Sequence, residues 1–160
     1  MKKILVVGLM ASFTFLGSVR DTCAADFRKC FKDAGERYGI NPLLLVAIAK
    51  QESNFNPQAV NKKNRNGTKD LGIMQVNSSW LRVLKEYGID EKNLFDPCTN
   101  INAAAWIFAN AIKDHGSSWR AVGVYNVGGA NGERREKNRV QYAKSVYRHY
   151  VALKLYLSSQ

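Results

Sequence analysis

Apolar residues recur at helical spacing over most of the chain. Side chains three and four positions apart share one side of a helix, so this pattern predicts a mainly helical protein. Glycines divide the pattern by ending helices, whereas Asn or Asp followed by Pro begins them. The predicted helices cover 27–38, 42–54, 78–88, 97–115, 119–126 and 138–157.

One long segment interrupts the helical pattern. Residues 55–72 are rich in Asn, Lys and Gly and show no helical period. This composition predicts a loop, with room for a small hairpin. The chain has no visible repeat, low-complexity tract or linker, so we expect one α-rich domain with this single irregular insertion.

The N-terminus has the layout of a secretory signal peptide. Lys2 and Lys3 precede an almost wholly apolar, uncharged stretch at 4–17, and small residues follow. The stretch is too short for a comfortable membrane span. A buried N-terminal helix is the alternative, but the two lysines favour export. We expect cleavage after Ala25, with Ala24 as second choice, leaving residues 26–160 as a periplasmic single domain without a membrane anchor.

Cleavage would change the cysteine count and the charge. It removes Cys23, and an exported chain is then expected to join Cys30 to Cys98 in a disulfide. Two distant cysteines and two histidines lack the spacing of a metal site. The removed segment carries three basic residues and one acid, so the net charge falls from +11 to +9. That charge favours an anionic partner, for which nucleic acid, membrane surface and cell wall all qualify.

Glu52 is the first candidate for chemistry. It follows Leu45, Ile48 and Ala49 at helical spacing, so a carboxylate lies on the face that should be buried. Burial disfavours the charged form and raises the pKa, as a general acid near neutral pH requires. For an arbitrary Glu, a solvent-exposed side chain at the helix end is the more common alternative.

Asp70 is the second candidate, at the end of the polar insertion. Polar surroundings should keep Asp70 ionised, whereas the surroundings of Glu52 are expected to be apolar. Two carboxylates in unlike environments form the acid and anion pair of glycoside cleavage. A turn residue explains Asp70 equally well, because turns favour Asp.

Aromatic and basic residues give weaker signals. Tyr125 and Asn126 precede two glycines and could contact a sugar, although a helix end explains them equally well. Tyr142 on the last helix is a core residue or steers a neighbouring carboxylate. The tryptophans are expected in the core, and the basic clusters at 62–69 and 134–139 are expected in solvated loops. No nucleic-acid-binding fold or interleaved aromatic pattern is present, so nucleic acid is not an expected partner.

Taken in order, these motifs resemble those of the soluble lytic transglycosylases. The similarity spans nearly the whole chain after residue 25, and its compact form resembles the small enzymes that accompany secretion machines and pili. The motifs are Ala47-Ile48-Ala49-Lys50-Gln51-Glu52-Ser53, Gly72-Ile73-Met74-Gln75, Tyr125-Asn126-x-Gly128 and the late Tyr142.

A second resemblance is to animal-type lysozymes. The runs that begin at Glu52 and at Asp70 are similar to the active-site segment of those enzymes, in which both carboxylates act. Many lytic transglycosylases lack an acid at the second place. Val124 and Val127 also depart from the alanines usual in the family, and we interpret them as packing variants.

The resemblance implies a lysozyme-like, mainly α (α+β) fold with a substrate groove between two lobes. Glu52 would be the catalytic acid and base that cleaves peptidoglycan glycan strands, with Asp70 and Tyr142 beside it and no metal or cofactor. A monomer is expected, serving a secretion system or pilus. A hydrolytic muramidase and a non-catalytic wall-binding factor remain as alternatives. The residues expected to bind substrate are Ser53, Met74, Gln75, Asn77, Tyr125 and Asn126.

Overall fold

The computed structural model describes residues 19–160, with side chains from residue 27 onward. The predicted signal peptide, residues 1–25, lies largely outside this part, and cleavage after Ala25 would fall within the first helix. No helix of the described residues is long and apolar enough to cross a membrane. In chain order the elements are α1 (Val19–Tyr38), α2 (Pro42–Ser53), β1 (Val60–Asn61), β2 (Asp70–Leu71), β3 (Val76–Asn77), η1 (Ser78–Trp80), α3 (Leu81–Leu84), η2 (Lys85–Tyr87), η3 (Asn93–Phe95), α4 (Pro97–His115), α5 (Trp119–Val127) and α6 (Glu133–Ser158), where η marks a 3-10 helix.

The helix starts that the sequence marks most clearly are found in the structure. Before α2, the Asn41 side-chain oxygen accepts a hydrogen bond of 2.9 Å from the Leu43 amide. Before α4, the Asp96 carboxylate accepts one of 2.8 Å from the Thr99 amide. In both cases the cap satisfies an amide that has no partner within its own helix.

Three predicted helices differ from the structure. The first begins at Val19 rather than at Phe27. The last helix begins at Glu133 rather than near Asn138. Its first turn contains Glu133 and Glu136, and negative charge is favourable at a helix N-terminus. The segment 78–88 is divided into η1, α3 and η2, because 3-10 geometry is common at the ends of short helices.

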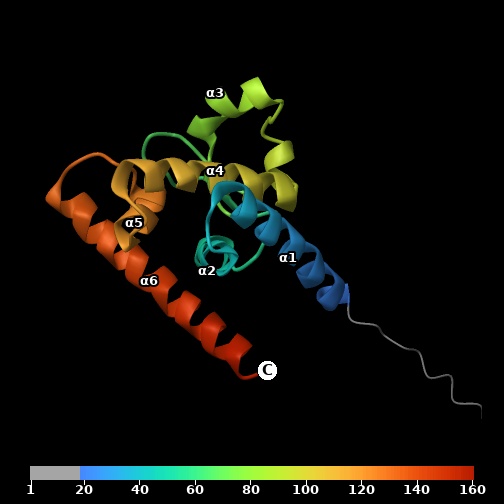
Figure 1. The fold of residues 1–160 in the computed structure, drawn as a ribbon. Coiled ribbons are helices and arrows are strands. Elements are labelled where there is room, and N and C mark those ends of the chain that lie inside the picture. The colour runs from blue at the N-terminus through green and yellow to red at the C-terminus, as the bar shows by residue number, and fades with distance from the viewer. Residues whose placement is uncertain (1–18) are drawn as a thin grey trace, which may run out of the picture.

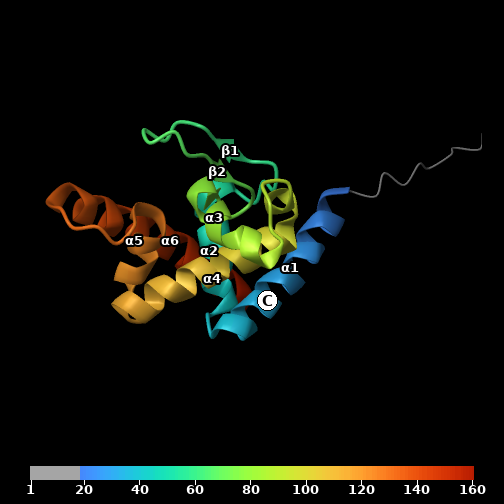
Figure 2. The ribbon, with the colours of Figure 1, turned by 90° about the horizontal axis from the view of Figure 1, so that it is seen from above.

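Helix α4 crosses the centre of the molecule (Figure 1). Helices α1 and α5 pack against it, α2 packs against α1 and α6, and α5 packs along α6. In both views, the loop between β1 and β2 and the turn between α5 and α6 lie at the same end of the molecule (Figures 1 and 2). The fold is therefore the mainly α architecture that the sequence predicts.

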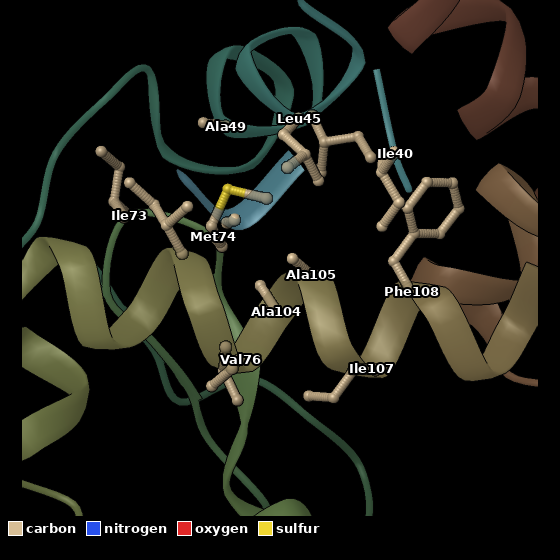
Figure 3. Close-up of a cluster of buried hydrophobic side chains, with 14 of the residues drawn as sticks. Ile40, Leu45, Ala49, Ile73, Met74, Val76, Ala104, Ala105, Ile107 and Phe108 are labelled. Atoms are coloured by element: carbon tan, nitrogen blue, oxygen red, sulfur yellow. The ribbon is translucent and has the colours of Figure 1, made fainter. Parts of the chain in front are cut away.

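The core lies where α2 faces α4 (Figure 3). Leu45 of α2 and Met74 of the loop before β3 are fully buried against Ala104, Ala105 and Phe108 of α4. Because each fully buried large apolar side chain contributes about 2 kcal/mol, this cluster anchors α2 firmly.

The three strands form one small antiparallel sheet in the order β1-β2-β3. In its register, Asp70 is paired with Asn61 on one side and with Asn77 on the other. Side chains of directly paired residues project from the same face of a sheet. The predicted hairpin is therefore present, extended by a third strand beyond residue 72, and it places one acid between two amides.

A disulfide joins Cys30 of α1 to Cys98 of α4, with 5.0 Å between their Cα atoms. This confirms the predicted pairing. The bridge links two segments that are separated by 68 positions in the sequence. It adds a covalent connection to the packing of α1 on α4.

Candidate active site

A groove of about 860 Å³ lies between the small sheet and the α4–α5 side of the molecule. Polar side chains of the sheet and its loops line one wall, and the ends of α4 and α5 with the loop after α5 line the other. Of the residues predicted for the site, those that line the groove are Glu52, Asp70, Gln75, Asn77, Tyr125 and Asn126.

Glu52 lies one residue before the end of α2. Leu45, Ile48 and Ala49 on the same face are fully buried, so the predicted helix register places this carboxyl at the edge of the core. Asn54 then adopts a left-handed conformation (φ 54°) and ends the helix. As a result, Glu52 is half-buried and forms part of the groove lining.

Burial raises the pKa of the Glu52 carboxyl from its ordinary 4.5 to about 7. A hydrogen bond from Tyr142 opposes the rise, the negative charge of Asp70 adds to it, and a hydrogen bond from Asn126 opposes it. The Tyr142 hydroxyl donates to Glu52 Oε1. Glu52 is therefore a carboxylic acid that can give and take a proton near neutral pH, as general acid–base catalysis requires.

Asp70 is held by three side-chain amides. Asn61 and Asn64 each donate to Asp70 Oδ2 at 2.9 Å, and Asn77 donates to Oδ1 at 2.7 Å. The Asn77 amide also donates to Thr68 Oγ1 at 2.9 Å. These donors hold the Asp70 carboxylate in a fixed orientation at the lining of the groove.

Tyr125 connects the two walls of the groove. Its hydroxyl donates to the Met74 carbonyl at 2.8 Å. Burial, followed by the charges of Glu52 and Asp70, raises the pKa of Tyr125 well above its usual range. The phenol therefore stays protonated and serves as a donor, while its neighbour Asn126 offers an amide to Glu52.

Two predicted substrate-binding residues lie elsewhere. The Met74 side chain is fully buried in the core and is not part of the groove lining, because it lies between α2 and α4 (Figure 3). The Ser53 hydroxyl donates to the Ile73 carbonyl at 2.7 Å and accepts from the Asn56 amide at 3.0 Å. Ser53 thus ties the end of α2 to the next loop, and Met74 contributes its backbone.

Gln75 lines the groove in a left-handed conformation (φ 51°). Its side-chain amide donates to the Gly72 carbonyl at 2.9 Å and to the Ala59 carbonyl at 3.1 Å. Gln75 therefore also connects the turn between β2 and β3 to Ala59, the residue that precedes β1. A side chain predicted to bind sugar has a second task in holding the loop.

Sequence reasoning missed Asn100 of α4. It is 1% exposed, and its side-chain oxygen accepts from the Met74 amide at 2.8 Å. Its side-chain nitrogen donates to the carbonyls of Leu71 and Leu94, at 2.9 and 2.8 Å. The only available signal was a polar residue within an apolar helix face, which does not reveal its partners.

Arg139 was also misassigned by the sequence interpretation. The cluster at 134–139 was expected to be solvated, yet Arg139 is 2% exposed and Arg134 is exposed. Arg139 lies on the side of α6 that packs against Gly123 of α5, so it is buried where these two helices meet. The helical register thus separates one buried arginine from exposed neighbours.

The three tryptophans, which were expected in the core, are half-buried or exposed. Trp80, which was expected in the core, is half-buried, lines the groove and packs edge to face on Trp106, with ring centroids 5.7 Å apart. Trp119 is 39% exposed and packs against Tyr147. Trp80 therefore offers an aromatic surface beside the polar sheet.

The site combines a proton donor, a fixed anion and polar groups along an open groove. Glu52 can protonate a leaving oxygen, and the oriented Asp70 charge can stabilise a cationic transition state. Amide groups from Asn77 and Asn126 can hydrogen-bond hydroxyl or acetamido groups. This set of groups suits cleavage of a glycosidic bond in an extended carbohydrate chain.

Comparison with known proteins identifies the family. Residues 29–148 match the transglycosylase SLT domain. The match includes every residue predicted for the site and covers most of the chain. The chain therefore belongs to the transglycosylase SLT domain family.

Similar proteins come from enteric bacteria. Protein IpgF of Shigella flexneri is 42% identical over 125 residues, which are 78% of this chain and 80% of that protein. Invasion protein IagB of Salmonella typhimurium is 42% identical over 126 residues, which are 78% of this chain and 77% of that protein.

The fold is similar to that of a solved lytic transglycosylase. An inactive mutant of Slt from Pseudomonas aeruginosa superposes with a TM-score of 0.60 at 19% sequence identity. The match covers 90% of this chain and 25% of the Slt chain. This likeness shows the lysozyme-like fold, and it concerns only a quarter of the larger protein.

Proposed function

We propose that this protein is a peptidoglycan lytic transglycosylase. It cleaves the β-1,4 bond between N-acetylmuramic acid and N-acetylglucosamine and leaves 1,6-anhydro ends. The observation that carries the proposal is the Glu52 carboxyl, which lines the groove with a pKa raised to about 7. Membership of the transglycosylase SLT domain family supports the choice of reaction.

In the proposed reaction, Glu52 gives its proton to the glycosidic oxygen as the bond from that oxygen to the anomeric carbon breaks. The oxocarbenium-like muramyl residue is stabilised by the Asp70 charge. Glu52, now a carboxylate, takes the proton of the muramyl 6-hydroxyl, whose oxygen bonds to the anomeric carbon. The ring closes without consuming water, and Glu52 ends in its starting form.

Product analysis tests this proposal. Purified peptidoglycan is digested with the mature protein, and the fragments are separated and weighed by mass spectrometry. We expect 1,6-anhydromuramyl ends, each lighter by one water than a reducing end. Reducing ends alone would contradict the transglycosylase assignment and leave the muramidase reaction.

A hydrolytic muramidase is the second candidate, and Asp70 favours it. The three amides that orient this carboxylate give it the fixed position that a second acidic group needs. Asp70→Asn keeps the size of the side chain and removes the charge. We expect a rate loss of roughly a hundredfold, since removing an oriented stabilising group commonly has that effect. A near-normal rate would make Asp70 a turn residue.

A non-catalytic wall-binding factor is the third candidate. Glu52→Gln keeps the hydrogen-bonding shape but cannot transfer a proton. We expect the folded variant to bind wall fragments and to lose at least about a thousandfold in rate, because it lacks the general acid. If it clears wall suspensions as fast as the wild type, Glu52 is not the catalyst.

We further propose that the protein is exported to the periplasm and opens the wall locally, as a monomer, for a secretion system or pilus. Two observations support this setting: the name of the Salmonella relative, an invasion protein, and the predicted signal peptide. The mass of the protein from the periplasmic fraction tests export. We expect a chain beginning at Asp26, and a full-length chain retained in the cytoplasm would contradict it.

A further inference from the structure

Arg139 is a buried cation outside the set of residues that act on the glycosidic bond. Its guanidinium always carries charge, and burying a charge is strongly unfavourable unless the charge is paired and hydrogen-bonded. At 2% exposure it is one of the largest side chains in the interior. Its partners therefore indicate what the fold gains from it.

Most of its donors point to one loop. Arg139 Nε and Nη2 donate to the Gly128 carbonyl at 3.0 and 2.6 Å, and Nη2 also donates to the Ala130 carbonyl. Nη1 donates to Glu136 Oε2 at 2.8 Å, and Glu136 also accepts from Arg120 at 2.6 Å. The Nε and Nη2 groups of the planar guanidinium thus hold two loop carbonyls, while Glu136 accepts from Nη1 and orients the group.

That loop forms part of the groove wall. Gly128 and Gly129 line the groove directly after Tyr125 and Asn126 of α5. The segment 128–132 contains three glycines, which lose more conformational freedom on ordering than other residues. Without an external constraint, this wall would sample many positions. The Arg139 hydrogen bonds supply that constraint from beneath.

The packing of α5 on α6 is built for this contact. A Cβ at Gly123 would lie 2.6 Å from the Arg139 Cβ and 2.7 Å from its carbonyl oxygen. Only glycine allows this approach, so the backbone of Arg139 lies directly against the middle of α5. Glu52 is contacted by Tyr142 and Asn126, whereas the Arg139 guanidinium donates to the loop and to Glu136.

We propose that Arg139 is a positioning residue for glycan binding: its guanidinium fixes the loop 128–130 as a wall of the sugar groove. It sets the affinity for a β-1,4-linked N-acetylhexosamine strand and leaves the proton transfer of Glu52 unchanged. The inference rests on the proposed function for the identity of this ligand.

Arg139→Lys tests the inference, because lysine keeps the positive charge but lacks the planar guanidinium and its several N–H donors. Arg134→Lys makes the same change at an exposed position of the same helix. We measure kcat and KM on peptidoglycan, the pH profile, and the Kd of a soluble chitooligosaccharide by calorimetry. For Arg139→Lys, KM and Kd should rise about tenfold, since charge-assisted hydrogen bonds to the loop are lost. The value of kcat and the alkaline limb of the pH profile should stay as in the wild type.

An unchanged KM and Kd in folded Arg139→Lys would overturn the inference, as would an equal loss in Arg134→Lys. So would a fall in kcat with KM unchanged, because that pattern indicates a role in the chemical step. If Arg139→Lys does not fold, Glu136→Gln leaves the arginine in place and weakens its orientation. Glu136→Gln should also raise the Kd, and an unaltered Kd would overturn the inference.

The binding measurement separates this inference from the proposed function. A wild-type protein that binds the oligosaccharide but yields no anhydro product would refute the transglycosylase reaction alone. The comparison of Kd between the two arginine variants would still decide the role of Arg139. Loss of loop order is checked by amide hydrogen exchange at 128–132, which should quicken only in Arg139→Lys.

Discussion

Glu52 links function to stability because the folded state raises its pKa from 4.5 to about 7. The folded protein therefore holds this proton more tightly than the unfolded chain. The resulting stability is fully present below about pH 4.5 and is lost as the pH rises through about 7. Glu52→Gln removes this dependence, so the variant should be more stable than the wild type at alkaline pH.

The expected gain is roughly 3 kcal/mol in the free energy of unfolding at about pH 8.5, with little difference near pH 4. Urea unfolding at both values measures it. Glu86→Gln, at an exposed position, serves as the control and should show no such divergence. Equal effects of Glu52→Gln at both pH values would show that burial does not shift this carboxyl.

Tyr142 lowers the pKa of Glu52 by donating a hydrogen bond to it. Tyr142→Phe removes that donor, so Glu52 should stay protonated to higher pH. The alkaline limb of the pH–rate profile should move up by roughly one pH unit, because a hydrogen bond to a charged group contributes about 1.5 kcal/mol. Tyr147→Phe, on the same helix and 50% exposed, is the matched control. A limb that stays in place or moves down would contradict this role.

At this scale the sequence predicts only some of the site. Glu52 is visible as a carboxyl on an apolar helix face, which needs only the helical period. Met74 and Arg139 were misassigned, because which way a loop side chain or a helix-end cation points depends on tertiary packing. Asn100 was missed because its partners are backbone groups of Leu71, Met74 and Leu94, and the sequence does not show how the turn after β2 packs on α4.

Among the elements, the tight turn after β2 makes the sharpest demand on one residue. Gly72 has φ +76°, and an added Cβ would lie 2.3 Å from the Leu94 carbonyl and 2.4 Å from the Asn100 side-chain nitrogen. Gly67 has nearly the same φ, +75°, with nothing within 4 Å of the same position. Substitutions at the two glycines can therefore be compared to separate the effect of backbone strain from that of steric clash.

Gly67→Ala should lower the free energy of unfolding by about 1 kcal/mol, through backbone strain alone. Gly72→Ala should lower it by roughly 2 kcal/mol more, because the clash forces the turn away from α4. Urea unfolding of both variants measures the difference. If the two losses are equal, the close contact between this turn and α4 is not a determinant of stability.

Element boundaries show where local sequence is sufficient. Asn41 and Asp96 mark helix starts that the structure contains, because a cap and a following proline act within one turn. Each strand is two residues long, too short for an alternating pattern, so the sequence predicts a hairpin without its register. Yet the register is what pairs Asp70 with Asn61 and Asn77, and it depends on contacts across the sheet.

For the whole molecule, the disulfide is expected to govern stability and to have little effect on catalysis. It joins α1 to α4, whereas Glu52 and Tyr142 come from α2 and α6, which pack directly on each other. Reduction removes the constraint on a long loop of the unfolded chain. It should lower the free energy of unfolding by roughly 4 kcal/mol on the chain-entropy estimate.

Urea unfolding with and without reductant measures this loss, and the mass should rise by two hydrogens on reduction. A variant with both Cys30→Ser and Cys98→Ser is the control, and its stability should not respond to reductant. At 25 °C the reduced protein should keep the wild-type kcat as long as it stays folded, because neither Cys30 nor Cys98 is among the residues that line the groove. A fall in kcat before any unfolding would show that the α1–α4 link also shapes the groove, and an unchanged stability would show that packing alone holds α1 in place.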